Sequence, residues 1–110
     1  MYEDIYNKII EYLKENSGVF YTIVNKGNPM AYKLYVYKNT IHISIPNNCI
    51  KTTSTYGPIY KKDFDNLYPL FLEYLECKDL KHLKKQAHRV SFKSVYWIGL
   101  FFELKSRGII

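Results

Sequence analysis

Two short runs rich in β-branched and aromatic residues, Tyr32 to Tyr37 and Thr40 to Ile45, are separated by only Lys38 and Asn39. A two-residue connection of this kind predicts a tight antiparallel hairpin, and Asn39 can adopt a left-handed conformation at little cost. The turn also sets the register, because a slip of one residue would move every side chain to the other face of the sheet. The chain is therefore expected to contain an antiparallel sheet.

The register predicted for this hairpin sorts its side chains onto two faces. One face is expected to be core and holds apolar pairs: Val36 with Ile41, Leu34 with Ile43, and Tyr32 with Ile45. The other face pairs Tyr37 with Thr40, Tyr35 with His42, and Lys33 with Ser44. Its aromatic side chains could stack on unpaired bases, and its basic side chains could neutralise the phosphates of the nucleic-acid backbone. The candidate residues are Lys33, Tyr35, Tyr37 and His42. Alternatively, a helix covers this face and makes the tyrosines core residues.

Further strands are expected on either side of the hairpin. Residues 19–24 are β-branched and aromatic, and a dense turn signal follows at residues 25–29. Residues 50–56 are β-prone and rich in Thr, and their low apolar content is typical of an edge strand. Gly57 and Pro58 are expected to break the sheet.

Helical periodicity appears before and after the strands. Apolar residues recur at three- and four-residue steps over residues 2–16 and again from Phe64 to Leu75, where Pro69 predicts a kink. Two more helices are expected, over residues 78–89 and 92–105. The sequence thus predicts one α+β domain over residues 1–110, with an N-terminal helix, a three- or four-stranded antiparallel meander over residues 19–56, and then three helices.

Composition limits the class of protein. Of the 110 residues 47% are hydrophobic, including 12 Tyr and 6 Phe, which favours a folded domain over a disordered chain. The longest apolar run, Val95 to Phe102, is too short to cross a bilayer, and the acidic N-terminus does not resemble a secretory signal. Cys49 and Cys77 lack a metal-binding spacing and are interpreted as reduced thiols. We therefore expect a cytoplasmic protein without a membrane segment.

The segment from Lys78 to Arg89 separates charged from apolar residues at helical spacing, and it carries a net charge of +4 out of +6 for the chain. One side is basic: Lys78, Lys81, His82, Lys85 and Arg89. The opposite side is apolar: Leu80, Leu83, Ala87 and Val90. The basic side could lie along DNA or RNA phosphates without reading the bases, since the chain has 14 Lys and only 2 Arg. It could equally be a solvated face, or dock against an acidic partner surface.

The helix expected over residues 92–105 has almost no polar side. A helix that is apolar all round is normally buried on all sides, which is demanding within one small subunit. A homodimer interface is an alternative explanation, with these candidate residues: Trp97, Phe101 and Phe102. Trp97 could also be an ordinary core residue.

No motif indicates catalysis, a metal or a cofactor. His82 and His88 are six residues apart and lie on different sides of a helix, so they cannot share a metal ion there. A ribonuclease-like site that uses His42 or His88 is conceivable, although no spacing requires it. We expect neither a bound metal nor a cofactor, and a non-enzyme is favoured over an enzyme.

Four short patterns resemble a small module found in proteins of restriction systems, phages and mobile elements. They are Phe20-x-Thr22, Ile41-x-Ile43, Tyr60-x-x-Asp63-Phe64 and Ser94-x-Tyr96-Trp97. The resemblance implies a short meander followed by helices, in a setting of nucleic-acid metabolism, and it supplies no catalytic residue. The tyrosine-rich N-terminal helix is not part of it.

Three functions are consistent with these features. The favoured hypothesis is a non-enzymatic intracellular protein that associates with DNA or RNA through the basic helix, as a dimer. The alternative is an interaction or assembly module that dimerises through its apolar terminal helices. A small ribonuclease-like toxin is the third.

Overall fold

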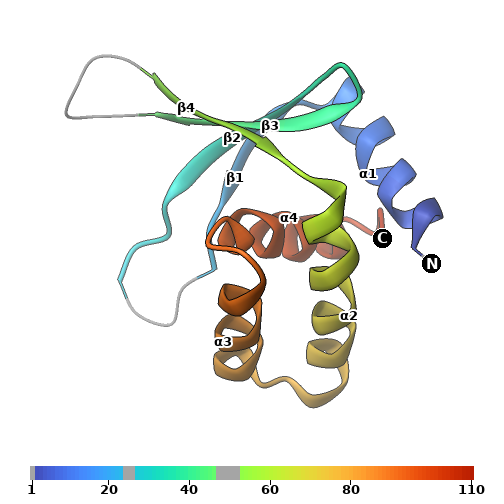
Figure 1. Cartoon of the computed structure of the whole chain (residues 1–110), viewed down its shortest axis with the longest axis vertical. Helices are drawn as coiled ribbons and strands as arrows, with labels where there is room; N and C mark the ends of the chain where they lie inside the picture. The colour runs from blue at the N-terminus through green and yellow to red at the C-terminus, as the bar shows by residue number, and fades with distance from the viewer. Residues whose placement is uncertain (1, 24–26, 47–52) are drawn as a thin grey trace.

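The computed structural model describes residues 2–23, 27–46 and 53–110, and it confirms the α+β fold (Figure 1). The elements follow in this order: α1 (Glu3–Glu15), β1 (Gly18–Tyr21), β2 (Ala31–Tyr37), β3 (Thr40–Pro46), β4 (Thr53–Ile59), α2 (Lys61–Cys77), α3 (Leu80–Val90) and α4 (Ser94–Ser106). The four strands form one antiparallel sheet in the order β1-β2-β3-β4. The meander and the three helices after it are therefore as predicted.

The hairpin of β2 and β3 has the predicted register. Leu34 pairs with Ile43 and Tyr35 pairs with His42, as expected from the two-residue turn. Both turn residues have positive φ, 51° for Lys38 and 60° for Asn39, which is the conformation that a tight two-residue hairpin requires.

β4 extends further than the sequence indicated. Gly57 and Pro58 do not break the sheet, because they pair with Ile43 and His42 of β3. β4 is an edge strand, where proline can be accommodated, and Gly57 takes a φ of 80° beside an irregularity in the register between Ile43 and Ser44. The first residues of the predicted strand, 50–52, lie outside the described residues, as does Cys49.

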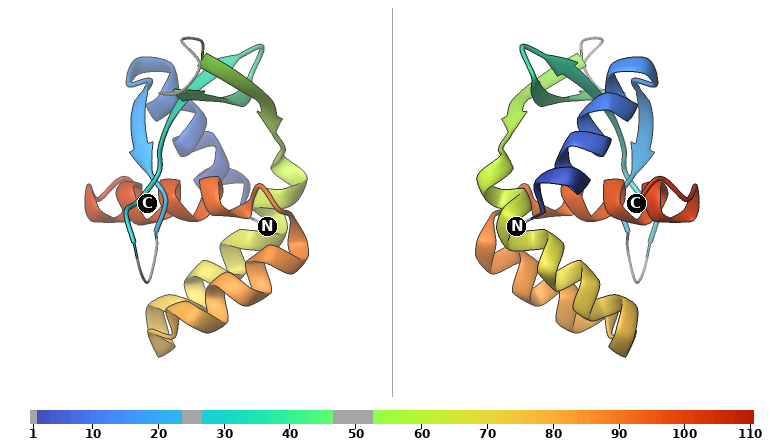
Figure 2. Two further views of the ribbon diagram at one scale, coloured as in Figure 1. Left: turned by 90° about the vertical axis from the view of Figure 1, so that its left-hand side faces the viewer. Right: turned by 90° about the vertical axis from the view of Figure 1, so that its right-hand side faces the viewer.

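α4 forms the centre of the molecule. In both views of Figure 2 it lies between the sheet and the pair formed by α2 and α3. It is buried along nearly its whole length: Ser94, Tyr96, Trp97, Ile98, Gly99, Leu100, Phe101 and Leu104. The sheet, α2 and α3 thus bury a helix that is apolar all round within a single chain.

The remaining helices cover α4 and one face of the sheet. α1 packs on β2 through an apolar stripe that includes Ile9 and Leu13, both fully buried. α2 continues through Pro69, which is exposed, as one helix. None of the described helices is long and apolar enough to span a bilayer.

Candidate functional site

The outer face of the sheet carries aromatic side chains that are open to solvent. Tyr35 stacks on His42 with ring centroids 5.5 Å apart, and Tyr37 meets the same imidazole edge-on at 5.8 Å. Tyr37 is 57% exposed, whereas Tyr32 and Leu34 on the inner face are fully buried. The structure therefore supports the exposed surface that was one of the two alternatives, and it does not place a described helix over these tyrosines.

β1 adds two residues to this face that the sequence reasoning missed. Val19 pairs with Lys33, and Tyr21 pairs with Ala31, so both point to the same side as Tyr35. Val19 is 50% exposed and Tyr21 is 58% exposed. Val19 and Tyr21 flank the buried Phe20, so the alternation of a strand already places them on the opposite side from Phe20. Only the pairing of β1 with β2 shows that this side is the outer face of the sheet. We call the following residues the sheet surface: Val19, Tyr21, Lys33, Tyr35, Tyr37 and His42.

Positive charge accompanies these aromatic rings. Lys33 is exposed in the middle of β2, and Nζ of Lys38 lies 5.4 Å from the centre of the Tyr37 ring. The sequence has no Asp or Glu from residue 16 to residue 62, a stretch that includes the whole sheet. The sheet surface therefore combines stacking rings with a purely positive set of formal charges.

The basic stripe on α3 is only partly as predicted. Lys81, Lys85 and Arg89 are exposed on this helix, and within the described part of the chain no carboxylate pairs with them. Lys78 does not belong to the helix. It ends α2 in a left-handed conformation with φ of 58°, and its ammonium group lies 5.8 Å from the centre of the Tyr74 ring.

Asp79 explains why the helix begins two residues later than predicted, at Leu80. Its carboxylate accepts a hydrogen bond from the backbone N–H of His82 at 3.0 Å, so it is the N-cap of α3. Nε2 of His82 lies 3.4 Å from Oε1 of Glu73, which turns this histidine toward α2. The predicted stripe is thus reduced to Lys81, Lys85 and Arg89.

The two candidate binding regions lie on different elements, the sheet and α3. Figure 1 shows the sheet in the upper half of the molecule and α3 in the lower half. Lys61, which starts α2, is bound to Glu3 at 2.6 Å and to Asp65 at 3.2 Å. The pKa of Lys61 is raised by its hydrogen bonds to Glu3 and Asp65, so its charge is held by partners within the chain.

The three candidate interface residues lie mostly inside the molecule. Trp97 and Phe101 are fully buried and pack on Phe64, with Trp97 at 5.6 Å and Phe101 at 5.9 Å between ring centroids. Phe102 is half-buried and stacks on Tyr74 at 5.2 Å. A partner could contact Trp97 or Phe101 only if the core opened, so these two are core residues.

The histidines do not assemble into one site. His42 is on β3, whereas His82 and His88 are on α3 in the other half of the molecule (Figure 1). Among the residues that the structure describes, no three side chains of His, Cys, Asp or Glu are grouped so that they could hold a metal ion. The ribonuclease-like hypothesis therefore gains no geometric support from these residues.

No family model, curated protein or solved structure matches this chain.

Proposed function

We propose that this protein is a non-enzymatic binder of single-stranded nucleic acid, with the sheet surface as the platform on which bases stack. The observation that carries the proposal is the row of tyrosines on the outer face, with Tyr21 and Tyr37 more than half exposed. Exposing large aromatic rings in this way favours contact with a flat apolar ligand, and every nucleobase has such a face. Stacking on an aromatic side chain contributes about 1–3 kcal/mol per base.

The charges on the same face support contact with a nucleic-acid backbone. Lys33 lies between the exposed Val19 and Ser44 across the strands, and Lys38 lies at the end of the hairpin beside Tyr37. Lysine ammonium groups at these positions can neutralise phosphates while the rings hold the bases. The absence of acidic residues from residue 16 to residue 62 removes the repulsion that would oppose this contact.

The expected recognition tolerates many sequences. Bidentate base reading is mainly a property of arginine, and neither arginine of this chain is on the sheet. Arg89 is on α3, and Arg107 is bound to Glu103 at 2.7 Å and to the Tyr12 hydroxyl group. Single strands should bind more tightly than duplexes, because the bases of a duplex are already stacked and do not present their faces.

Fluorescence anisotropy tests this proposal with a labelled oligothymidylate of about 12 nucleotides, a length within the range that a small stacking surface covers. We expect binding at about 50 mM salt that weakens as salt is added. Tyr37→Ala should weaken the binding about tenfold, which corresponds to the loss of about 1.4 kcal/mol from one stacked base. Its ring is already largely exposed, so the change should leave the fold intact.

Phe92→Ala is the matched control. Phe92 is 73% exposed, lies in the turn between α3 and α4, and is not part of the sheet. Its removal should not change the affinity for the oligonucleotide. The absence of binding to any single-stranded DNA or RNA at about 50 mM salt would overturn the proposal and would make the sheet surface a contact for another protein.

A further inference from the structure

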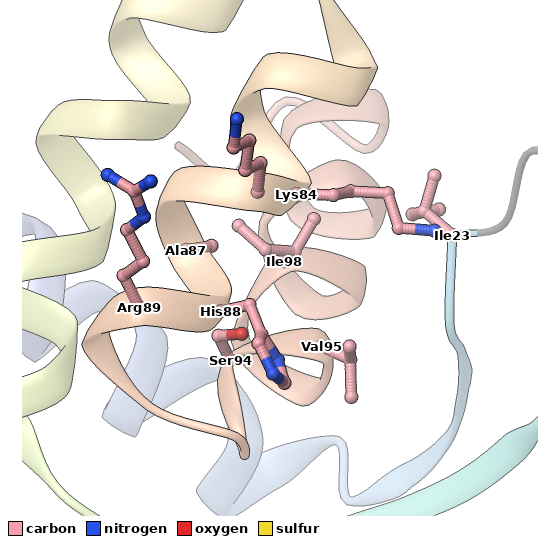
Figure 3. Close-up of a pocket in the computed structure, with 9 residues that line it drawn as sticks. Ile23, Lys84, Ala87, His88, Arg89, Ser94, Val95 and Ile98 are labelled. Carbon is pink, nitrogen blue, oxygen red and sulfur yellow. The ribbon is translucent and has the colours of Figure 1, made fainter.

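A pocket of about 450 Å³ lies between α3, α4 and the segment that follows β1 (Figure 3). Its floor is formed by Ala87, Ser94 and Ile98, which are all at least 97% buried. Val95 and Ile23, both half-buried, form its walls. The volume is within the range of about 300–1,000 Å³ that is usual for small-molecule sites.

The rim of this pocket is cationic. Four basic side chains line it: Lys84, Lys85, His88 and Arg89. Figure 3 shows Lys84 extending across the opening toward Ile23, with His88 on the side of Val95 and Arg89 turned away from the centre. None of the described residues that line the pocket is an Asp or Glu. The first turn of α4 begins here at Ser94, so the positive end of its dipole adds to the charge of the rim.

Ser94 supplies a polar group inside the apolar floor. It is only 2% exposed, and it lines the pocket. A serine hydroxyl group can donate one hydrogen bond to a ligand and accept others from it. The pocket therefore offers an apolar body, one buried hydroxyl group and a cationic rim.

We propose that this pocket binds an organic anion with an unbranched apolar chain, of the class of medium-chain alkyl carboxylates. Charge complementarity selects the anion, since the rim holds only basic side chains, with Lys84 the one that reaches over the opening. The floor of Ala87 and Ile98 selects the apolar chain, and it would leave the hydroxyl groups of a sugar without partners. This site is separate from the sheet surface and does not depend on its function.

Decanoate, below its micelle concentration, is the probe, with 1-decanol and acetate as comparison ligands. Amide shifts in a two-dimensional NMR spectrum should change at Ala87, Ser94 and Ile98 when decanoate is added. Acetate should not bind, because each buried CH₂ contributes about fourfold to affinity. Decanol should bind more weakly than decanoate, since it lacks the charge that the rim would neutralise.

Lys84→Gln separates the contribution of the charge from that of the fold. The affinity for decanoate should fall about fivefold while the affinity for decanol is unchanged, as expected for a half-buried ion pair. Lys105→Gln, at the exposed end of α4, should change neither affinity. Val95→Phe should weaken both ligands by filling the pocket, and circular dichroism would confirm that this variant is folded.

Three results would overturn the proposal. The first is the absence of decanoate binding at millimolar concentration, and the second is an equal loss of decanoate and decanol affinity in Lys84→Gln. The third is displacement of decanoate by an oligonucleotide that shifts the amide of Ser94. That displacement would make the pocket part of a nucleic-acid site.

Discussion

The hydroxyl group of Tyr32 donates a 2.7 Å hydrogen bond to the backbone carbonyl of Tyr96, in the interior of the molecule. Tyr32 is on β2, in the sheet, and Tyr96 is in the first turns of the central helix α4. Their rings also meet edge-on, with centroids 5.0 Å apart. One pair of side chains therefore connects the inner face of the sheet to the helix that the other elements surround.

Tyr32→Phe should lower the free energy of unfolding by about 1 kcal/mol at neutral pH, which is the usual net contribution of one hydrogen bond. The loss is modest because the carbonyl of Tyr96 lies within a helix and keeps an intrahelical partner. Urea unfolding followed by circular dichroism measures this difference. Tyr37→Phe is the control, since its ring is exposed on the sheet surface and its unfolding curve should match that of the wild type.

Stability should also fall at alkaline pH because of Tyr32. Burial, and then the nearby Tyr96, raise the pKa of Tyr32 well above its ordinary value of 10. As the pH rises, the unfolded chain releases the Tyr32 proton at a lower pH than the folded chain does. The contribution of Tyr32 to the free energy of unfolding is therefore fully present below about pH 10, and above that it falls by about 1.4 kcal/mol per pH unit. Burial also raises the pKa of Tyr6 and Tyr68, which adds to the decline.

Unfolding curves at several pH values between about 8 and 11 test this linkage. The difference between wild type and Tyr32→Phe should shrink above about pH 10, since the variant has no phenol to lose at this position. Parallel stability curves for the two proteins across this range would contradict the prediction.

Gly99 of α4 lies close to Tyr21 of β1 and Tyr32 of β2. A Cβ atom at this position would collide with the hydroxyl group of Tyr32 and would lie 2.5 Å from the carbonyl oxygen of Tyr21. Gly99→Ala should therefore destabilise the fold by about 3 kcal/mol, because neither backbone nor a fully buried ring can move aside cheaply. Gly57→Ala is a useful comparison. Among the described residues, no atom lies within 4 Å of the added Cβ, but φ is 80°, so we expect a cost of about 1 kcal/mol from the backbone alone.

Thermal unfolding of these two variants separates the two causes. Gly99→Ala should lower the midpoint temperature by more than Gly57→Ala does. Equal effects would show that the contact between α4 and the sheet is looser than the structure indicates.

The sheet was largely predictable because its hairpin turn has only two residues. A turn made of only Lys38 and Asn39 allows a single register between β2 and β3, and the pairing of Tyr35 with His42 follows from that register. Gly57 and Pro58 were misread, since the same two residues that usually end a strand are also the ones that an edge strand uses at a bulge. Sequence alone does not show that β4 is long enough to include them.

The start of α3 was misplaced for a different reason. The charge periodicity includes Lys78, so a helical wheel places it in the helix. In the structure Lys78 ends α2 in a left-handed conformation, and Asp79 is the N-cap of α3. An Asp before an apolar helical run is a recognised N-cap signal, so Asp79 could have marked the boundary. The prediction followed the spacing of the charges and therefore placed the start of the helix at Lys78.

The candidate pocket was not predictable from any one segment. Ile23 follows β1, while Lys84 and Ser94 belong to α3 and α4, and only the packed fold brings them together. In the same way, Tyr21 joins the sheet surface only through the pairing of β1 with β2. Local patterns predict the elements, but sites made from distant segments depend on how those elements pack.

The last prediction decides between the sheet surface and α3 as the place where phosphates bind. For a single strand, each lost phosphate contact makes the slope of log affinity against log salt shallower by about 0.7. Lys33→Gln should give this change in slope, whereas the double change Lys81→Gln and Lys85→Gln should leave the slope and the affinity for oligothymidylate as they are. All three lysines are exposed, so the variants should fold equally well. If the double variant instead loses about twice this slope while Lys33→Gln behaves as the wild type, the basic stripe of α3 is the nucleic-acid contact and the tyrosines of the sheet serve another purpose.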